Sequence, residues 1–244
     1  MGAGALPQRR DPIAQLGIIA ALPAEARLLQ RCSAGVEVLC AGVGAHNARV
    51  AAERLLNDGA QALLSWGSAG ALDPSLPPGC LVLPDCVIDS RGTKFIVDSD
   101  WHARLRQRLH GHLDVHTGAL LESPSMVSGI GQKRSLFASY DAVAVDMESA
   151  TIARVAGSAG VPFVAVRAIA DPADMALPGC VGRAIDTQGR INTTRLLSSV
   201  ALRPSDWAAV ARLGWCFRRA QHTLAEVARL CGTTLLAPQP APRT

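Results

Sequence analysis

Carboxylates follow apolar stretches in the segment from residue 143 to residue 174, which reads VAVDMESATIARVAGSAGVPFVAVRAIADPAD. The run VPFVAVRAIA is apolar and rich in β-branched residues, which predicts a strand covered on both faces of an α/β sheet. Asp171 comes directly after this strand. Ligands of open α/β sheets bind beyond the carboxyl ends of the strands, so Asp171 is a candidate for acid–base chemistry. An Asp-Pro pair is also an ordinary turn signal, which leaves a structural role open.

Two further acids, Asp146 and Glu148, precede the Ala-rich segment ATIARVAGSAG, which predicts a helix. Acids at the start of a helix interact favourably with its dipole, so each has a structural explanation. Residues two positions apart do not share a face of a helix. We therefore expect one of the two carboxylates to serve structure and the other to face a pocket.

Glu25 stands in a similar place at the other end of the chain. Residues 17–22, GIIAAL, predict a first parallel strand, and PAEARLLQRC begins a helix with Pro23 in its first turn. This places Glu25 just beyond the carboxyl end of the strand. A Glu in a first helical turn is commonly a dipole partner, so its position alone does not decide its role.

Two glycine-rich segments accompany these acids. The GVG turn that ends at Gly44 lies between a predicted strand and an amphipathic helix, where backbone amides can approach an anion or a hydroxyl-rich group. A second predicted strand, ALLSW, runs into Gly67, Ser68, Ala69 and Gly70, and a Pro-rich loop follows.

Composition limits the classes of protein to which the chain can belong. With 244 residues and 49% hydrophobic content, the chain can bury one large core. We expect a flexible segment over residues 1–14, a single catalytic domain over 15–232 and a disordered, Pro-rich tail over 233–244. The net charge of +4 comes from scattered residues, which argues against nucleic-acid binding. The seven cysteines have no C-x-x-C spacing, and they predict reduced thiols in a cytoplasmic protein.

Two local patterns could suggest a secretory signal and a metal site, but each has a simpler structural explanation. The N-terminal QRRDPIAQLGIIAALPAEA imitates a secretory signal, but its apolar core is short and an acid follows at once, which favours a strand. No apolar run approaches the roughly 18 residues that a membrane span needs. Four of the six histidines lie in the middle of the chain, at spacings that do not repeat a helical pair with a supporting acid, so we expect no metal site. These are His102, His110, His112 and His116.

The joined motifs VDMESATIARVA and VPFVAVRAIADPAD resemble the signature of the nucleoside phosphorylase and nucleosidase superfamily. In addition, GIIAALPAEARLL resembles the opening of the methylthioadenosine and adenosylhomocysteine nucleosidases. The resemblance implies a three-layer α/β/α sandwich with a central, twisted, mixed and mostly parallel sheet. It also implies an enzyme that cleaves the N-glycosidic bond of an adenine nucleoside.

The resemblance assigns roles to particular residues. Asp171 would protonate the leaving base, while Arg167 and Glu25 would orient the nucleophile, and these three form the catalytic set. Glu148 would accept both ribose hydroxyls, an arrangement that rejects deoxy sugars by leaving a buried acceptor unpaired. The remaining predicted contacts to the substrate are Met147, Ser68, Ala69, Gly70, Met126, Val127 and Gly44.

The nucleophile stays open between water and phosphate. The chain lacks the G-x-P-x-R segment of the superfamily's phosphorylases, and Ser65 stands where many of them carry an Arg. Both departures favour water. His46, Arg49 and Ser68 could nevertheless form a modest anion site, which keeps phosphate open as a co-substrate. No other cofactor is expected.

Residues 186–230 resemble the C-terminal part of the hopanoid-associated phosphorylases, which act on the lipid nucleoside adenosylhopane. The resemblance implies a lipid-linked substrate and a function in hopanoid biosynthesis. The apolar stripe and basic border of the helix predicted for residues 204–230 fit core packing, a homodimer or larger homo-oligomer, or peripheral contact with the inner membrane. A methylthioadenosine/adenosylhomocysteine nucleosidase and a non-enzymatic carrier of nucleosides or lipids are the alternatives.

Overall fold

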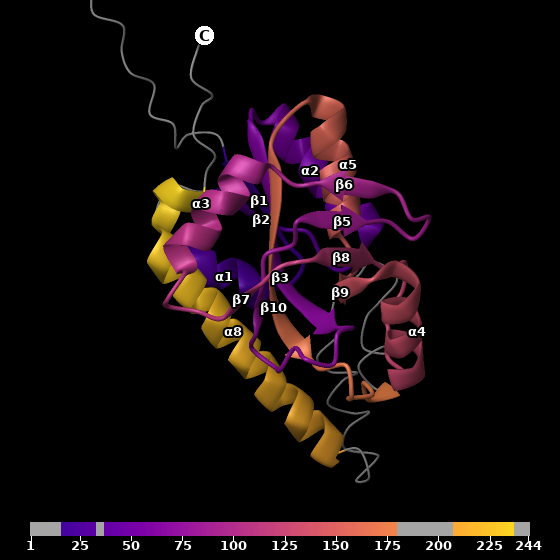
Figure 1. The fold of residues 1–244 in the computed structure, drawn as a ribbon. Helices are drawn as coiled ribbons and strands as arrows, with labels where there is room; N and C mark the ends of the chain where they lie inside the picture. The colour runs from indigo at the N-terminus through magenta and orange to yellow at the C-terminus, as the bar shows by residue number, and fades with distance from the viewer. Residues whose placement is uncertain (1–15, 33–36, 180–206, 237–244) are drawn as a thin grey trace, which may run out of the picture.

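The computed structural model describes residues 16–32, 37–179 and 207–236. The predicted flexible N-terminus, residues 186–206 of the C-terminal resemblance and residues 237–244 of the predicted tail lie outside this part of the chain. The described residues form one sheet with helices on both of its faces (Figure 1).

The sheet has ten strands and mixes parallel with antiparallel pairs. Its strands are β1 (Leu16–Ala20), β2 (Glu37–Cys40), β3 (Ala62–Ala71), β4 (Leu81–Val82), β5 (Cys86–Ile88), β6 (Lys94–Ile96), β7 (Val115–His116), β8 (Ala119–Glu122), β9 (Ala142–Asp146) and β10 (Phe163–Asp171). Along the main path their order is β6-β5-β8-β9-β3-β10-β4-β7, and β1 joins β2 to β3. Parallel pairs predominate, as predicted.

Strand β3 organises the centre of the sheet. Its first half pairs with β1 in parallel, while Gly70 and Ala71 at its end pair with β9 in antiparallel fashion. Strand β10 runs parallel to β3 along the opposite edge, and every one of its residues is buried. The apolar run in β10 therefore forms the doubly covered strand that its sequence predicts.

Helices complete the outer layers. On one face, α8 packs on β10 and contacts α1 and α3, whereas α2 and α5 pack together on the other face (Figure 1). The helices are α1 (Pro23–Cys32), α2 (Ala45–Asn57), α3 (Ser99–Leu109), α4 (Ile130–Tyr140), α5 (Ser149–Ala159) and α8 (Trp207–Leu236). This arrangement confirms the predicted α/β/α architecture.

The last helix extends beyond the predicted end of the domain at residue 232. Helix α8 continues to Leu236, across a kink at Gly232, where φ is 58°. Its buried face consists mainly of small and apolar residues, including Cys216, Ala220 and Leu224. Within residues 16–32, 37–179 and 207–236, no helix is both long and apolar enough to cross a membrane.

Candidate active site

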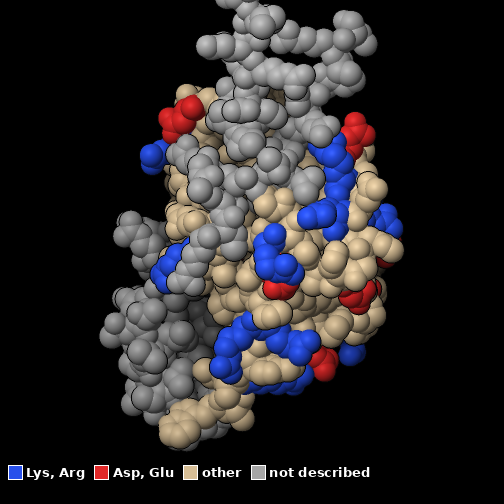
Figure 2. Space-filling view, turned by 90° about the vertical axis from the view of Figure 1, so that its left-hand side faces the viewer, with Lys and Arg blue, Asp and Glu red and all other residues tan. Residues whose placement is uncertain are grey.

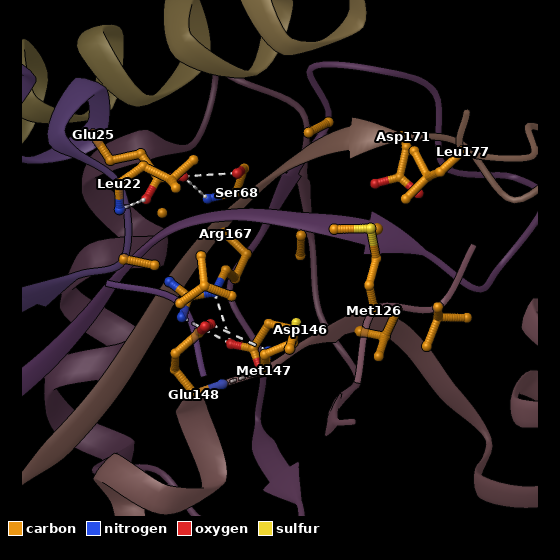
Figure 3. Close-up of a pocket in the computed structure, with 18 of the residues that line it drawn as sticks. Leu22, Glu25, Ser68, Met126, Asp146, Met147, Glu148, Arg167, Asp171 and Leu177 are labelled. Atoms are coloured by element: carbon orange, nitrogen blue, oxygen red, sulfur yellow. Dashed lines mark hydrogen bonds and ion pairs between the residues drawn. The ribbon is translucent and has the colours of Figure 1, made fainter. Parts of the chain in front are cut away.

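A pocket opens where the carboxyl ends of the central strands meet. Its lining includes the three acids that the sequence singled out, namely Glu25, Glu148 and Asp171. They come from the first turn of α1, the entry of α5 and the last residue of β10. Figure 3 shows Glu25 beside Ser68 on one side of the pocket, Asp171 on the other, and Glu148 below them. The tertiary structure thus gathers carboxylates that lie far apart in the sequence.

Glu25 is buried and firmly held. Its Oε1 accepts hydrogen bonds from the backbone N of Ser68 at 2.9 Å and from Ser68 Oγ at 2.7 Å. Its Oε2 accepts one from the backbone N of Leu22 at 3.1 Å. Burial raises the pKa of Glu25 above its ordinary value, although these hydrogen bonds oppose the shift. A carboxyl group whose pKa moves toward neutrality is suited to general-base chemistry.

The two glycines of the G-S-A-G segment, which lies within β3, make room for two of the acids. A Cβ atom on Gly67 would lie 2.7 Å from Glu25 Oε2, and one on Gly70 would lie 3.0 Å from Asp171 Oδ2. In the sheet, Gly70 is the direct partner of Asp171 across β3 and β10. Close approach of the two carboxylates to the β3 backbone thus accounts for glycine at both positions.

Asp171 forms a buried ion pair that the sequence analysis missed. Its Oδ2 accepts a hydrogen bond from Lys133 Nζ at 2.5 Å, and Lys133 is completely buried. Burial raises the pKa of Asp171, and the positive charge of Lys133 opposes this shift. Lys133 gives no sequence signal, because a lysine in a polar helix such as GQKRSLFASY is normally exposed.

Arg167 is held in a second buried ion pair. Its Nε and Nη2 donate to Asp146 Oδ2 at 2.9 and 2.8 Å, and Nη2 also donates to Ser65 Oγ at 2.6 Å and to Ser149 Oγ at 2.9 Å. Ser65 stands where many of the superfamily's phosphorylases carry an Arg, and here it accepts a hydrogen bond from Arg167. The guanidinium lines the pocket but is committed to these neighbours.

Glu148 is the acid of the D-M-E motif that faces the pocket without an ion-pair partner among the described residues. Its Oε1 accepts a hydrogen bond from the backbone N of Gly44 at 2.7 Å. Burial, and then the negative charge of Asp146, raise the pKa of Glu148 to about 8. Asp146 pairs with Arg167, whereas Glu148 contacts no cation among the described residues, and both acids line the pocket.

The other predicted contacts fall into two groups. Ser68, Ala69, Gly70, Met126, Val127 and Met147 all line the pocket. Gly44 does not line the pocket. Its backbone N–H donates a hydrogen bond to Glu148 and so holds that side chain in place.

The proposed anion site of His46, Arg49 and Ser68 is not brought together. Arg49 pairs with Glu53 at 2.8 Å on the exposed side of α2, and neither Arg49 nor His46 lines the pocket. Ser68 is engaged by Glu25. Of the three residues, only Ser68 lines the pocket, and Arg49 and Ser68 are each bound by a different glutamate.

The central histidines divide between interior and surface. His102 is buried, with Nε2 at 3.0 Å from the carbonyl oxygen of Leu83, which differs from the solvated or capping role expected of it. His116 lies 3.1 Å from Asp114 at the surface. Over the residues that the structure describes, no group of three or more His, Cys, Asp or Glu side chains is arranged to hold a metal ion.

The fold and the pocket define a class of protein, an α/β enzyme with buried acids at the carboxyl ends of its strands. The chain belongs to the phosphorylase superfamily, since the family model with that description matches residues 4–193. This match confirms the superfamily that the sequence motifs predicted.

Individual relatives are nucleosidases. The 5′-methylthioadenosine/S-adenosylhomocysteine nucleosidase of Staphylococcus aureus (strain JH9) is 27% identical over 158 residues, which cover 57% of this chain and 69% of that protein. The corresponding Helicobacter pylori nucleosidase, solved with a pyrrolidine inhibitor, superposes with a TM-score of 0.67 at 16% identity and covers 89% of this chain and 97% of its own. Futalosine hydrolase of H. pylori strain 26695 gives a TM-score of 0.69 at 16% identity, with 89% and 96% covered. Together these matches support the predicted enzyme class, which cleaves N-glycosidic bonds.

Proposed function

We propose that this protein hydrolyses the N-glycosidic bond of an adenine nucleoside. The observation that carries the proposal is the placement of Asp171, a buried acid at the end of β10, in one pocket with Glu25 and Glu148. Cleavage of this bond produces an oxocarbenium-like sugar and an anionic purine, so the leaving base needs a proton. Asp171 delivers that proton to N7 of adenine. The nucleosidase relatives support this choice of substrate class.

The ribose is the part of the substrate that Glu148 recognises. The Gly44 N–H holds one oxygen of the Glu148 carboxyl group, which still has lone pairs for two hydroxyl donors. Met147 packs beneath the sugar, and residues Ser68 to Gly70 of strand β3 lie beside it. A 2′-deoxy substrate would leave a buried acceptor unpaired, which predicts discrimination against deoxynucleosides.

Water is the nucleophile that the charges of the pocket favour. Among the described residues that line it, Arg167 is the only cation, and Asp146 already neutralises it. Glu25 would repel a phosphate dianion but can accept a proton from water. Arg167 contributes indirectly by fixing Asp146 at the entry of α5. Phosphorolysis, with phosphate as co-substrate, is the alternative.

The 5′ substituent of the nucleoside is proposed to be a hopanoid lipid. Besides the resemblance of the C-terminal segment, the support comes from α8, where Trp207 and Trp215 are 56% and 48% exposed. Lys and Arg side chains outnumber acidic ones on the visible part of the face that carries α8 (Figure 2). Exposed indole rings beside basic residues suit peripheral contact with an anionic membrane. The same surface would form the interface of a homodimer. The activity would belong to the single domain of residues 15–232.

The decisive assay measures adenine release with and without phosphate, in the wild type and in Glu25→Gln. Hydrolysis predicts release that is independent of phosphate and a loss of roughly 10²-fold or more in Glu25→Gln. A ribose 1-phosphate product, or a Glu25→Gln variant that stays active with phosphate, would contradict hydrolysis. Adenosylhopane compared with methylthioadenosine tests the lipid separately, and a clear preference for methylthioadenosine would make the protein a nucleosidase for small thioethers.

A further inference from the structure

Helix α4 buries a single residue, and that residue is a lysine. Lys133 has no exposed surface, whereas its neighbours Gln132 and Arg134 are exposed. Lysine is almost never fully buried unless its charge is paired, because the ammonium group loses its hydration. A buried lysine on an otherwise polar helix therefore calls for an explanation in terms of the group that it contacts.

The acceptors of the Lys133 ammonium group among the described residues all lie in one short segment. Its Nζ donates to Asp171 Oδ2 at 2.5 Å, to the carbonyl oxygen of Pro172 at 2.8 Å and to that of Met175 at 3.1 Å. An ammonium group has three N–H donors, and these contacts use all of them. The backbone N of Leu177 also donates to the carbonyl oxygen of Ser128 at 2.9 Å, just before α4 begins. The end of β10 and the start of α4 are thus joined around Lys133.

Asp171 lies between Lys133 and the pocket. Asp171 lines the pocket, and Lys133 does not. The structure gives Asp171 Oδ2 a bond to Lys133, but it gives Oδ1 no hydrogen-bond partner among the described residues. One oxygen of the acid is thus occupied on the protein side, and the other is left for a ligand.

We propose that Lys133 is a positioning residue and the proton partner of Asp171, through which a proton of its ammonium group reaches the leaving base. The proposal rests on the proposed function, since it needs a reaction in which a base departs. The lysine orients the acid by the bond to Oδ2 and keeps one transferable proton in the buried pair.

The proton and electron balance is simple. Before the bond breaks, Nζ of Lys133 gives one proton to the Asp171 carboxylate, which becomes a carboxylic acid beside a neutral amine. As the bond between C1′ and N9 breaks, its electron pair passes to the purine, and N7 takes that proton from Asp171, which leaves a carboxylate beside the neutral amine. The attacking water binds C1′ through its oxygen and releases a proton to Glu25. Solvent then returns that proton to the lysine as the products leave.

Few other titratable groups face this pair. From α8, the thiol of Cys216 lies within reach of the Asp171 charge, and burial raises the pKa of this thiol, with Asp171 adding to the shift. Arg212 on α8 pairs with Asp174 at 3.6 Å, and a guanidinium keeps its charge over the whole accessible pH range. On α4 itself, Arg134 points to solvent. Lys133 is therefore the group whose removal should change the alkaline limb of the pH profile.

The test compares Lys133→Met, Lys133→Gln and Lys133→Arg with the wild type, and Arg134→Met on the exposed side of α4 serves as the matched control. We expect Met and Gln to lower kcat by about 10²-fold with little change in KM. We also expect the alkaline limb of the kcat profile to move to lower pH, because Asp171 alone releases its proton before a lysine does. Arg keeps the charge but does not release a proton, so it should restore stability and not kcat. The control should behave as wild type.

A double-mutant cycle keeps the proposal falsifiable if Lys133→Met folds poorly. When Lys133 acts only through Asp171, the variant that combines Lys133→Met with Asp171→Asn is no slower than Asp171→Asn alone. Additive losses, full activity of Lys133→Arg, or an unchanged alkaline limb in Lys133→Gln would each overturn the proposal. A wild type that releases base from no nucleoside would instead overturn the proposed function.

Discussion

Two buried ion pairs lie at the ends of β9 and β10, the strands on either side of β3, and they differ in how completely their carboxylates are bound. Asp146 at the end of β9 accepts two bonds from Arg167 and one from Ser149 Oγ on Oδ2, and the backbone N–H groups of Glu148 and Ser149 donate to Oδ1 at 3.3 Å. Asp171 at the end of β10 has a single bond from Lys133. Both carboxylates line the same pocket.

Under the proposed function, the difference separates a structural acid, Asp146, from a reactive one, Asp171. A carboxylate whose oxygens are both occupied, and whose partner is an arginine, can neither gain nor pass on a proton readily. A carboxylate with one free oxygen and a lysine behind it can do both. Burial alone does not distinguish the two acids, since both are nearly inaccessible to solvent.

Removing the cation of the fully bonded pair should have the largest effect. Arg167→Met leaves Asp146 buried without its counter-charge, and breaking such a pair typically costs about 3–5 kcal/mol of folding free energy. Urea denaturation would measure this loss. The matched control is Arg49→Met, which breaks an exposed pair on α2 and should cost at most about 0.5 kcal/mol. If Arg167→Met were as stable as Arg49→Met, Asp146 would not be a structural acid.

Removing the charge of the other acid should lower turnover and also cost some stability, because the fully buried Lys133 loses its counter-charge. Asp171→Asn keeps an acceptor for Lys133 but has no acidic proton, so base release should fall by roughly 10²-fold, equivalent to about 2.7 kcal/mol. Single-turnover assays and thermal melting would measure the two effects separately. Asp174→Asn, in the exposed part of the same segment, is the control and should keep full turnover. Unchanged turnover in Asp171→Asn would remove this residue from the mechanism.

The effect that is smallest within one pH unit comes from Glu148, whose pKa is raised first by burial and then by the negative charge of Asp146. With a pKa of about 8, folded Glu148 binds a proton that the unfolded chain releases near pH 4.5. Its contribution to stability is therefore complete below pH 4.5 and declines as the pH rises toward 8, by at most about 1.4 kcal/mol per pH unit. Glu148→Gln should flatten the dependence of Tm on pH between 5 and 8. Identical pH slopes in the two proteins would show that Glu148 ionises normally.

The sequence by itself determined the architecture and the set of acids. Apolar runs such as VPFVAVRAIA form buried strands whatever their neighbours, and the position of Asp171 directly after one of them places it at the ligand-binding edge of the sheet. The motifs around Glu25, Glu148 and the G-S-A-G segment likewise predicted residues that the structure brings into one pocket. For Glu25 and Asp171 the local pattern sufficed, because β1, β3 and β10 run parallel and end at the same edge of the sheet. Glu148 follows β9, which runs antiparallel to β3, so its place in the pocket depends on the packed sheet.

Only the tertiary structure decided which partner each acid has. Asp146 pairs with Arg167, and Asp171 pairs with Lys133, across 21 and 38 positions of the sequence. Nothing local marks Lys133 as buried, and nothing local directs Arg167 away from the nucleophile and toward Asp146. The free energy of an ion pair depends on the distance between two groups and on their removal from water, and both quantities arise only when distant segments pack. The sequence identifies the acids, but only the packed structure determines the ion-pair partner of each one.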